Sequence, residues 1–183
     1  MSPVPAEPEA PQDLELVAAW QGGDERAATR LVERHTPAIA RFLAGAGAPP
    51  SDLDDLVQET FFRAFRRLGS WRGESALRSW LFSIAANLLR DEFRRRKGRQ
   101  VIPIDDRDVP APGRPDGEFE ADEAERRIRA GLADLPRLQR EVFLLRAQQG
   151  IGYDEIAVAL GTTPGAARVH YHHAVKRLKE LVR

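Results

Sequence analysis

The chain has 183 residues, of which 42% are hydrophobic and 31% charged, and it contains no cysteine. This length and composition fit one globular domain or two small ones, and the lack of cysteine excludes disulfide bonds, thiolate catalysis and cysteine-ligated zinc. No apolar run approaches the ~20 residues that cross a bilayer, and the first residues lack the basic-then-apolar pattern of a signal peptide. A cytoplasmic protein without membrane contact is therefore expected.

The formal net charge of zero conceals an alternation along the chain. Residues 61–100 hold 11 Lys/Arg against 3 Asp/Glu, and residues 135–183 hold 8 against 4, while the stretch before each block is acidic. Two basic blocks predict two places where a polyanion docks. The alternative is that these charges only solvate the outer faces of helices.

In chain order, residues 1–12 are rich in proline and glutamate, so we expect a disordered tail. Residues 13–97 carry helical periodicity between breaks at "QGGDE", "GAGAPPSD" and "GSWRGES", and they are predicted to form a first domain. Residues 98–121 contain four prolines and no sustained period, which predicts a flexible linker. Residues 122–183 are helical again and are predicted to form a second domain. Because no stretch alternates as a β-strand does, the expected fold class is all-α, with two small helical domains.

Residues 52–68, "DLDDLVQETFFRAFRRL", are predicted to form an amphipathic helix. Its apolar residues recur at i, i+3 and i+4 spacing and form one stripe. The opposite side is expected to expose Asp55, Gln58, Glu59 and Phe62. A solvent-facing phenylalanine among acidic residues indicates a protein partner. The alternative is that Phe62 covers the loop before Trp71.

The next helix contains "ALRSWLFSIAANLLRDEFRRRK" and ends in an uninterrupted basic run. Two apolar sides are predicted to pack inward, one around Leu81 and the other around Phe82. The remaining face carries an indole, an amide and charged groups, from Trp80, Ser83, Asn87, Asp91 and Arg94. An amide that pairs with a base edge, beside an aromatic ring and arginines that hold phosphates, suits a single-stranded base. The alternative is that Trp80 belongs to the core and Asn87 merely faces solvent.

Residues 153–182 contain an explicit turn between two helices. A helix from Tyr153 to Leu160 is expected to end at Gly161, because glycine favours the left-handed conformation that closes a helix. Thr163 is placed to cap the next helix, and Pro164 to occupy its first position. A short helix, a tight turn and a longer basic helix predict a DNA-binding helix-turn-helix.

Periodicity divides the second of these helices into two faces. The inner face is predicted to pack on the domain and holds Ala167, Tyr171, Ala174, Leu178 and Leu181. The outer face is predicted to meet DNA and holds Arg168, Val169, His172, His173 and Lys176. Arginine reaches a guanine edge or a phosphate, and histidine or lysine contacts bases or backbone. The alternatives are that the histidines are ordinary surface residues and that the motif serves only protein contacts.

The sequence contains no motif for catalysis. There is no glycine-rich phosphate loop, no HExxH and no arrangement of nucleophile and base. The four histidines do not predict a metal site, because His172 and His173 splay apart on a helix while His35 lies in the other domain. We therefore expect no enzyme activity, no metal and no cofactor.

Two of these regions together resemble a known family. "DLDDLVQETFFRAFRRL" followed by "ALRSWLFSIAANLLRDEFRRRK" is similar to regions 2.1 to 2.4 of bacterial sigma-70-type factors. "LADLPRLQREVFLLRAQQGIGYDEIAVALGTTPGAARVHYHHAVKRLKEL" is similar to their region 4, and the order and linker resemble the extracytoplasmic-function (ECF) group. The resemblance implies a sigma factor that binds core RNA polymerase, recognises the −10 and −35 promoter elements and promotes strand opening. The alternative function is a stand-alone helix-turn-helix transcriptional regulator.

The resemblance also implies roles for particular residues. Contact with the polymerase β′ clamp coiled coil would involve Asp55, Gln58, Glu59 and Phe62. Recognition of the −10 element would involve Trp71, Arg72, Ser83, Asn87, Arg90, Asp91, Arg94 and Arg95, with Arg96 and Lys97 also on the backbone. Recognition of the −35 element would involve Arg168, Val169, His172, His173 and Lys176. The β flap of polymerase and an anti-sigma factor are further partners that the family implies.

Overall fold

The structure is a computed structural model and describes residues 9–71, 73, 75–99 and 123–182. Within these ranges it contains helices and turns but no strand, which confirms the all-α fold class. The N-terminal helices are α1 (Glu9–Gln21), α2 (Glu25–Ala46), α3 (Leu53–Arg67) and α4 (Leu77–Arg99), with 3-10 turns η1 (Pro50–Asp52) and η2 (Leu68–Ser70). The C-terminal helices are α5 (Glu123–Ala133), α6 (Arg137–Phe143), α7 (Tyr153–Leu160) and α8 (Pro164–Val182), with a π-helical turn η3 (Leu144–Gln148). None of the described helices is long and apolar enough to span a membrane.

Helices α2, α3 and α4 enclose the core of the N-terminal module. The apolar stripes predicted for α3 and α4 are buried, at Leu56, Val57, Phe61, Ala64 and Leu68 and at Leu77, Leu81, Ile84 and Leu88. The rings of Phe42 and Phe82 meet edge to face with centroids 5.3 Å apart, a geometry that adds ~0.5–1.5 kcal/mol to the burial of the rings. This packing fixes the rotation of α4 about its axis, and the rotation leaves Asn87 exposed.

Helix α1 is attached to α2 through the buried carboxylate of Asp13. The Asp13 and His35 side chains are each 3% exposed, and His35 Nε2 lies 3.1 Å from Asp13 Oδ2. Arg34 Nε lies 3.2 Å from Asp13 Oδ1 and compensates the same carboxylate, since a buried charge without partners is costly. Residues 1–12 were expected to form a disordered tail, but residues 9–12 are helical because α1 begins at Glu9. Residues 1–8 lie outside the described residues.

The helix-turn-helix has the turn chemistry that the sequence predicted. Helix α7 ends at Gly161, whose φ of 67° is left-handed and whose N–H donates to the carbonyl oxygen of Ala157. Thr163 Oγ1 accepts a hydrogen bond of 3.1 Å from the N–H of Ala166, and Pro164 is the first residue of α8. The inner face of α8 is buried at Ala167, Ala174 and Leu178, with Tyr171 half-buried. The opposite face of α8 is therefore directed outward.

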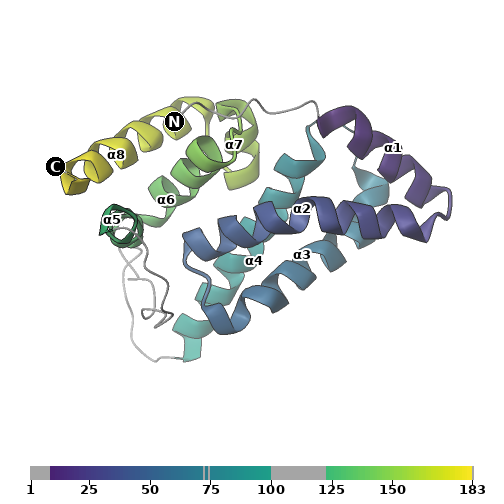
Figure 1. The fold of residues 1–183 in the computed structure, drawn as a ribbon, viewed down its shortest axis with the longest axis horizontal. Helices are drawn as coiled ribbons and strands as arrows, with labels where there is room; N and C mark the ends of the chain where they lie inside the picture. The colour runs from purple at the N-terminus through teal and green to yellow at the C-terminus, as the bar shows by residue number, and fades with distance from the viewer. Residues whose placement is uncertain (1–8, 72, 74, 100–122, 183) are drawn as a thin grey trace.

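The two helical modules pack against each other (Figure 1). Helix α7 lies on α4, and α6 with η3 lies on α2, so that one cluster of buried apolar side chains runs through both modules. The approach is close at Gly45 of α2, where an added Cβ would lie 2.9 Å from Leu144 Cδ2. Of the linker expected over residues 98–121, the first two residues continue α4, and the rest lies outside the described residues.

Candidate nucleic-acid interface

The exposed face of α4 is built around Asn87. Asn87 Oδ1 accepts a hydrogen bond of 2.6 Å from Arg90 Nη2, and Arg90 Nε donates to the carbonyl oxygen of Ala86 at 3.2 Å. Ser83 and Asp91 lie one turn to either side and are half-buried. The Ser83 hydroxyl donates to a carbonyl oxygen of its own helix. This part of α4 therefore presents an amide and a guanidinium side by side.

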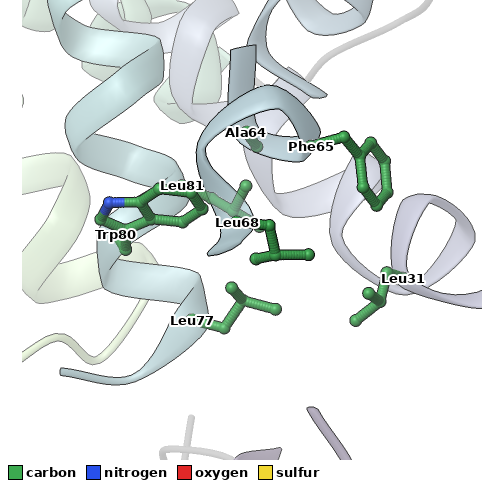
Figure 2. A pocket seen from close by; sticks show the side chains of 7 residues that line it. All are labelled: Leu31, Ala64, Phe65, Leu68, Leu77, Trp80 and Leu81. Carbon is green, nitrogen blue, oxygen red and sulfur yellow. The ribbon is translucent and has the colours of Figure 1, made fainter. Parts of the chain in front are cut away.

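Two turns before Asn87, the same side of α4 is covered by neighbouring chain. Trp80 is half-buried there and packs on the core. Figure 2 shows its indole beside Leu81, on the side of α4 where Leu68 and Ala64 lie. These side chains line an apolar pocket of about 10 Å³, roughly the space of one water molecule. The partial burial of Trp80 against the core favours its interpretation as a core residue, and its role as a stacking surface stays a prediction.

The loop before α4 is described at Trp71, Gly73 and Ser75. Trp71 is half-buried and packs against the core, and its indole Nε1 is buried with no hydrogen-bond partner in the described part of the chain. Arg72 lies outside the described residues. Its contact with the −10 element therefore stays a prediction.

The basic end of α4 is paired with acidic side chains of the same helix. Arg95 Nη2 lies 2.6 Å from Glu92 Oε2, and Arg94 Nη1 lies 3.8 Å from Asp91 Oδ1. The Arg94 and Arg95 side chains are still 79% and 65% exposed, and helix-surface pairs at this spacing contribute only ~0.2–0.5 kcal/mol. A phosphate would therefore displace these carboxylates at little cost. Arg96 is held more firmly, by Glu92 and by a carboxylate from the turn before α3.

The line of residues predicted on α3 lies on the surface. Asp55, Gln58 and Phe62 are exposed and Glu59 is half-buried. Phe62 is 57% exposed, so it does not cover the loop before Trp71. The Arg66 guanidinium lies 5.5 Å from the centroid of the Phe62 ring, and Glu59 Oε1 accepts a 2.7 Å hydrogen bond from Arg63. The face thus combines an accessible ring with acidic and amide groups.

The outer face of α8 is exposed along its length. It holds Arg168, Val169, His172, His173 and Lys176, as the periodicity predicted. The Arg168 guanidinium lies 5.2 Å from the centroid of the Tyr153 ring of α7, which limits the directions this long side chain explores. Nowhere in the described ranges do three His, Cys, Asp or Glu side chains gather as a metal site would require.

A fourth surface, which the sequence did not predict, joins α4 to the C-terminal module. Near the start of α4, the Ser79 hydroxyl donates to a carboxylate oxygen of Glu155 on α7. Beside it, Arg78 Nη2 donates to Oε1 of Gln149, which is 4% exposed. These polar contacts join the start of α4 to α7 and to the segment before α7.

Glu141 of α6 is a buried acidic side chain at this junction. Its side chain is 1% exposed, and its Oε1 accepts a 3.4 Å hydrogen bond from Arg137 Nη1. Burial raises the pKa of Glu141, while the charges of Arg137, Arg90 and Arg140 oppose that rise. Burial likewise lowers the pKa of Arg90, and the Glu141 carboxylate opposes that change. The only signal in the sequence was an acidic residue on the buried side of a short helix, which by itself indicates nothing.

These observations define an all-helical protein with two modules, one exposing an amide and arginines and the other a helix-turn-helix. Residues 31–99 match the family model of sigma-70 region 2, and residues 125–178 match that of sigma-70 region 4. The two matches contain α4 and the helix-turn-helix respectively. The chain therefore has the two regions of a sigma factor in the expected order.

Comparison with individual proteins gives the same result. The chain is 34% identical over 168 residues to RNA polymerase sigma factor NccH of Alcaligenes xylosoxydans xylosoxydans, covering 87% of this chain and 89% of NccH. It is similar to CnrH in complex with the cytosolic domain of CnrY, with a TM-score of 0.70, 29% identity and coverage of 93% and 97%. It is also similar to the sigma factor RpoE in complex with the anti-sigma factor NepR from Bartonella quintana, with a TM-score of 0.67, 26% identity and coverage of 84% and 95%.

The chain belongs to the sigma-70 family of RNA polymerase sigma factors, in its ECF group, a designation that further relatives carry in their names. It is thus a transcription initiation factor that acts with core RNA polymerase on promoter DNA. The prediction made from the two sequence motifs is confirmed at this level.

Proposed function

We propose that this sigma factor divides promoter recognition between its modules, with α4 capturing bases of the melted −10 element and α8 occupying the major groove at the −35 element. One observation carries the proposal: the Asn87 amide is exposed on α4 next to Arg90. Arg94 and Arg95, which are weakly paired with acidic side chains, follow one turn after Arg90. A base-reading amide and phosphate-binding cations thus lie along one helix.

At the −10 element, the physical requirement is to stabilise a base that has left the duplex. Unstacking a base costs a few kcal/mol, so an opened strand persists only when the protein replaces the lost contacts. Hydrogen bonds from Asn87 to the base edge and from Arg94 and Arg95 to phosphates would supply them. Ser83 and Asp91 border the same face, and Trp71 and Arg72 of the preceding loop complete the proposed surface.

At the −35 element, the duplex stays intact and α8 would enter the major groove. Arg168 would contact a guanine edge or a phosphate, and its position over Tyr153 reduces the entropy lost when it binds. Val169 is 52% exposed and would make apolar contact with a thymine methyl group. His172, His173 and Lys176 would contact the remaining bases and backbone.

The contact with core polymerase would use the exposed face of α3. An aromatic ring that is 57% exposed is a typical anchor of a protein interface, and Phe62 has this role in the proposal. Asp55, Gln58 and Glu59 would form the polar rim against the β′ clamp coiled coil. The C-terminal module would meet the β flap.

The packing of the two modules supports a further partner. The RpoE neighbour is bound to an anti-sigma factor, and we extend this kind of partner to the present chain. Helix α7 packs on α4, and Arg90 beside Asn87 is half-buried with Glu141 of α6 close to it, so part of this surface is covered. An anti-sigma factor would stabilise this packed form, whereas core polymerase would separate the modules.

The proposal assigns no reaction to the chain itself, because the polymerase forms the phosphodiester bonds. It assigns the chain to the cytoplasm, because core polymerase and promoter DNA are there. A stand-alone regulator would behave differently, since it would bind duplex operator DNA tightly in the absence of polymerase.

In vitro transcription with core polymerase and a library of linear duplex promoters tests these assignments. The wild-type chain should produce new start sites, and Asn87→Ala should lose initiation on duplex templates while retaining it on templates with a pre-melted −10 region. Gln148→Ala, which removes an exposed amide elsewhere, should behave as the wild type. If core polymerase gains no start sites, the proposed mechanism fails; if Asn87→Ala initiates normally on duplex DNA, the base-capture assignment fails.

A further inference from the structure

We infer that Arg90 is a positioning residue that fixes the orientation of the Asn87 amide by holding its carbonyl oxygen, so that Asn87 presents mainly its N–H donors to the captured base. The consequence is a preference for bases that carry two neighbouring acceptor atoms. This inference rests on the proposed role of Asn87 in −10 recognition and concerns the specificity of the same site.

The first step is the assignment of the amide atoms. An arginine side chain has five N–H donors and no acceptor, so the Asn87 atom that lies 2.6 Å from Arg90 Nη2 must be the carbonyl oxygen. The amide nitrogen then lies on the other branch of the side chain. Across the part of the chain that the structure describes, this nitrogen has no hydrogen-bond partner. Asn87 therefore has one of the two lone pairs of its carbonyl oxygen engaged by Arg90 and both of its N–H donors available.

The second step is that the arrangement belongs to α4 alone. Arg90 Nη2 reaches Asn87, and Arg90 Nε reaches the carbonyl oxygen of Ala86 at 3.2 Å. Both partners precede Arg90 by one helical turn, where side chains of a helix meet. The Arg90 guanidinium is thus held at two points of the same helix. It would persist when the C-terminal module moves away and the charge of Glu141 leaves with it.

The third step follows from base chemistry. An asparagine amide with both groups free pairs best with adenine, because adenine offers a donor next to an acceptor. With its oxygen held by Arg90, Asn87 makes that pairing less well, because the adjacent guanidinium donors face the amino donor of adenine and add no acceptor. Donors alone are best matched by guanine, through O6 and N7, or by cytosine, through O2 and N3. Thymine has no two neighbouring acceptors on its base-pairing edge.

The test is in vitro transcription by core polymerase and the full chain on a library randomised across the −10 element, with sequencing of the transcribed templates. Asn87→Ala locates the promoter position that Asn87 reads, because the base preference at that position should disappear in this variant. At that position Arg90→Met should shift the ratio of guanine plus cytosine to adenine toward adenine by about fivefold to tenfold, as expected from the loss of one oriented bidentate contact.

Two further variants separate orientation from charge and from packing. Arg90→Lys keeps the charge but lacks the planar fork, so it should show a shift similar to that of Arg90→Met. Glu141→Gln removes the buried carboxylate near Arg90 but leaves both helix anchors, so it should keep the wild-type base preference. Thermal unfolding of each variant establishes that it is folded. If Arg90→Met unfolds, the double variant Arg90→Met/Glu141→Gln, which has no uncompensated buried carboxylate, takes its place.

The outcomes are distinguishable. If Asn87→Ala flattens one position but both Arg90 variants keep the wild-type preference there, the positioning role is refuted and the base-capture proposal survives. A wild-type preference in Arg90→Lys alone would mean that charge suffices, which also refutes the positioning role. If Asn87→Ala flattens no position, the base-capture proposal itself fails.

Discussion

The substitution Arg140→Met tests how much stability one buried guanidinium provides. Arg140 is 5% exposed, and its two terminal nitrogens donate to the carbonyl oxygens of Ala133 at 2.6 Å, Leu135 at 3.0 Å and Ala46 at 3.3 Å. The first two belong to the end of α5 and its turn, and the third belongs to the end of α2. A hydrogen bond from a charged donor contributes ~1.5–3 kcal/mol. Burial of the guanidinium, which lowers the pKa of Arg140, offsets part of this gain. The net loss expected for Arg140→Met is therefore about 2–4 kcal/mol.

Thermal unfolding of the full chain, followed by circular dichroism, measures this loss. For a chain of this size each kcal/mol lowers the Tm by ~2–4 °C, so Arg140→Met should lower it by roughly 5–15 °C. Arg140→Lys should lose nearly as much, because the compact ammonium group lacks the planar fork that reaches the separated carbonyls. The control Arg41→Met, at an exposed position of α2, should stay within ~0.5 kcal/mol of the wild type. A similarly small change in Arg140→Met would refute the reasoning.

Three further predictions concern single side chains. Thr163→Ala removes the N-cap of α8 and should lower the free energy of unfolding by ~1 kcal/mol, which chemical denaturation measures. Because the pKa of Glu141 is raised above its ordinary value of 4.5 in the folded chain, the folded state binds this proton more tightly than the unfolded state. The free energy of unfolding of the wild type should therefore fall relative to that of Glu141→Gln as the pH rises from about 4.5 through the folded pKa, and the difference should then stay constant. Denaturation of both proteins at a series of pH values measures this difference, and a difference that does not change with pH would contradict the prediction. Phe62→Ala should weaken binding to core polymerase by ~1–2 kcal/mol in a titration, whereas Leu14→Ala, which removes an exposed apolar side chain of α1, should not.

The helices and the turns between them were predictable because their causes are local. Gly161 takes the left-handed conformation, Thr163 caps α8 and Pro164 begins it; each residue acts on its own few neighbours. The exposed line on α3 and the outer face of α8 were also predictable, because the helical period assigns each side chain an angle about the helix axis.

Trp80 shows what the helical period alone does not predict. It lies two turns from Asn87 on the same side of α4, so the period gives both residues the same direction. The period does not say how far along that side other helices extend, and at Trp80 they cover it. Whether a residue is a core ring or a free surface depends on segments distant in the sequence.

The sequence by itself determined the all-helical class, the helix-turn-helix and the family, because these depend on residue type and spacing within short segments. The tertiary structure alone decided that the C-terminal module rests on α2 and α4, that Glu141 is buried beside Arg90, and that three main-chain carbonyls converge on Arg140. The physical reason is that the desolvation of a charge depends on everything packed around it. That environment is assembled from helices that lie far apart along the chain.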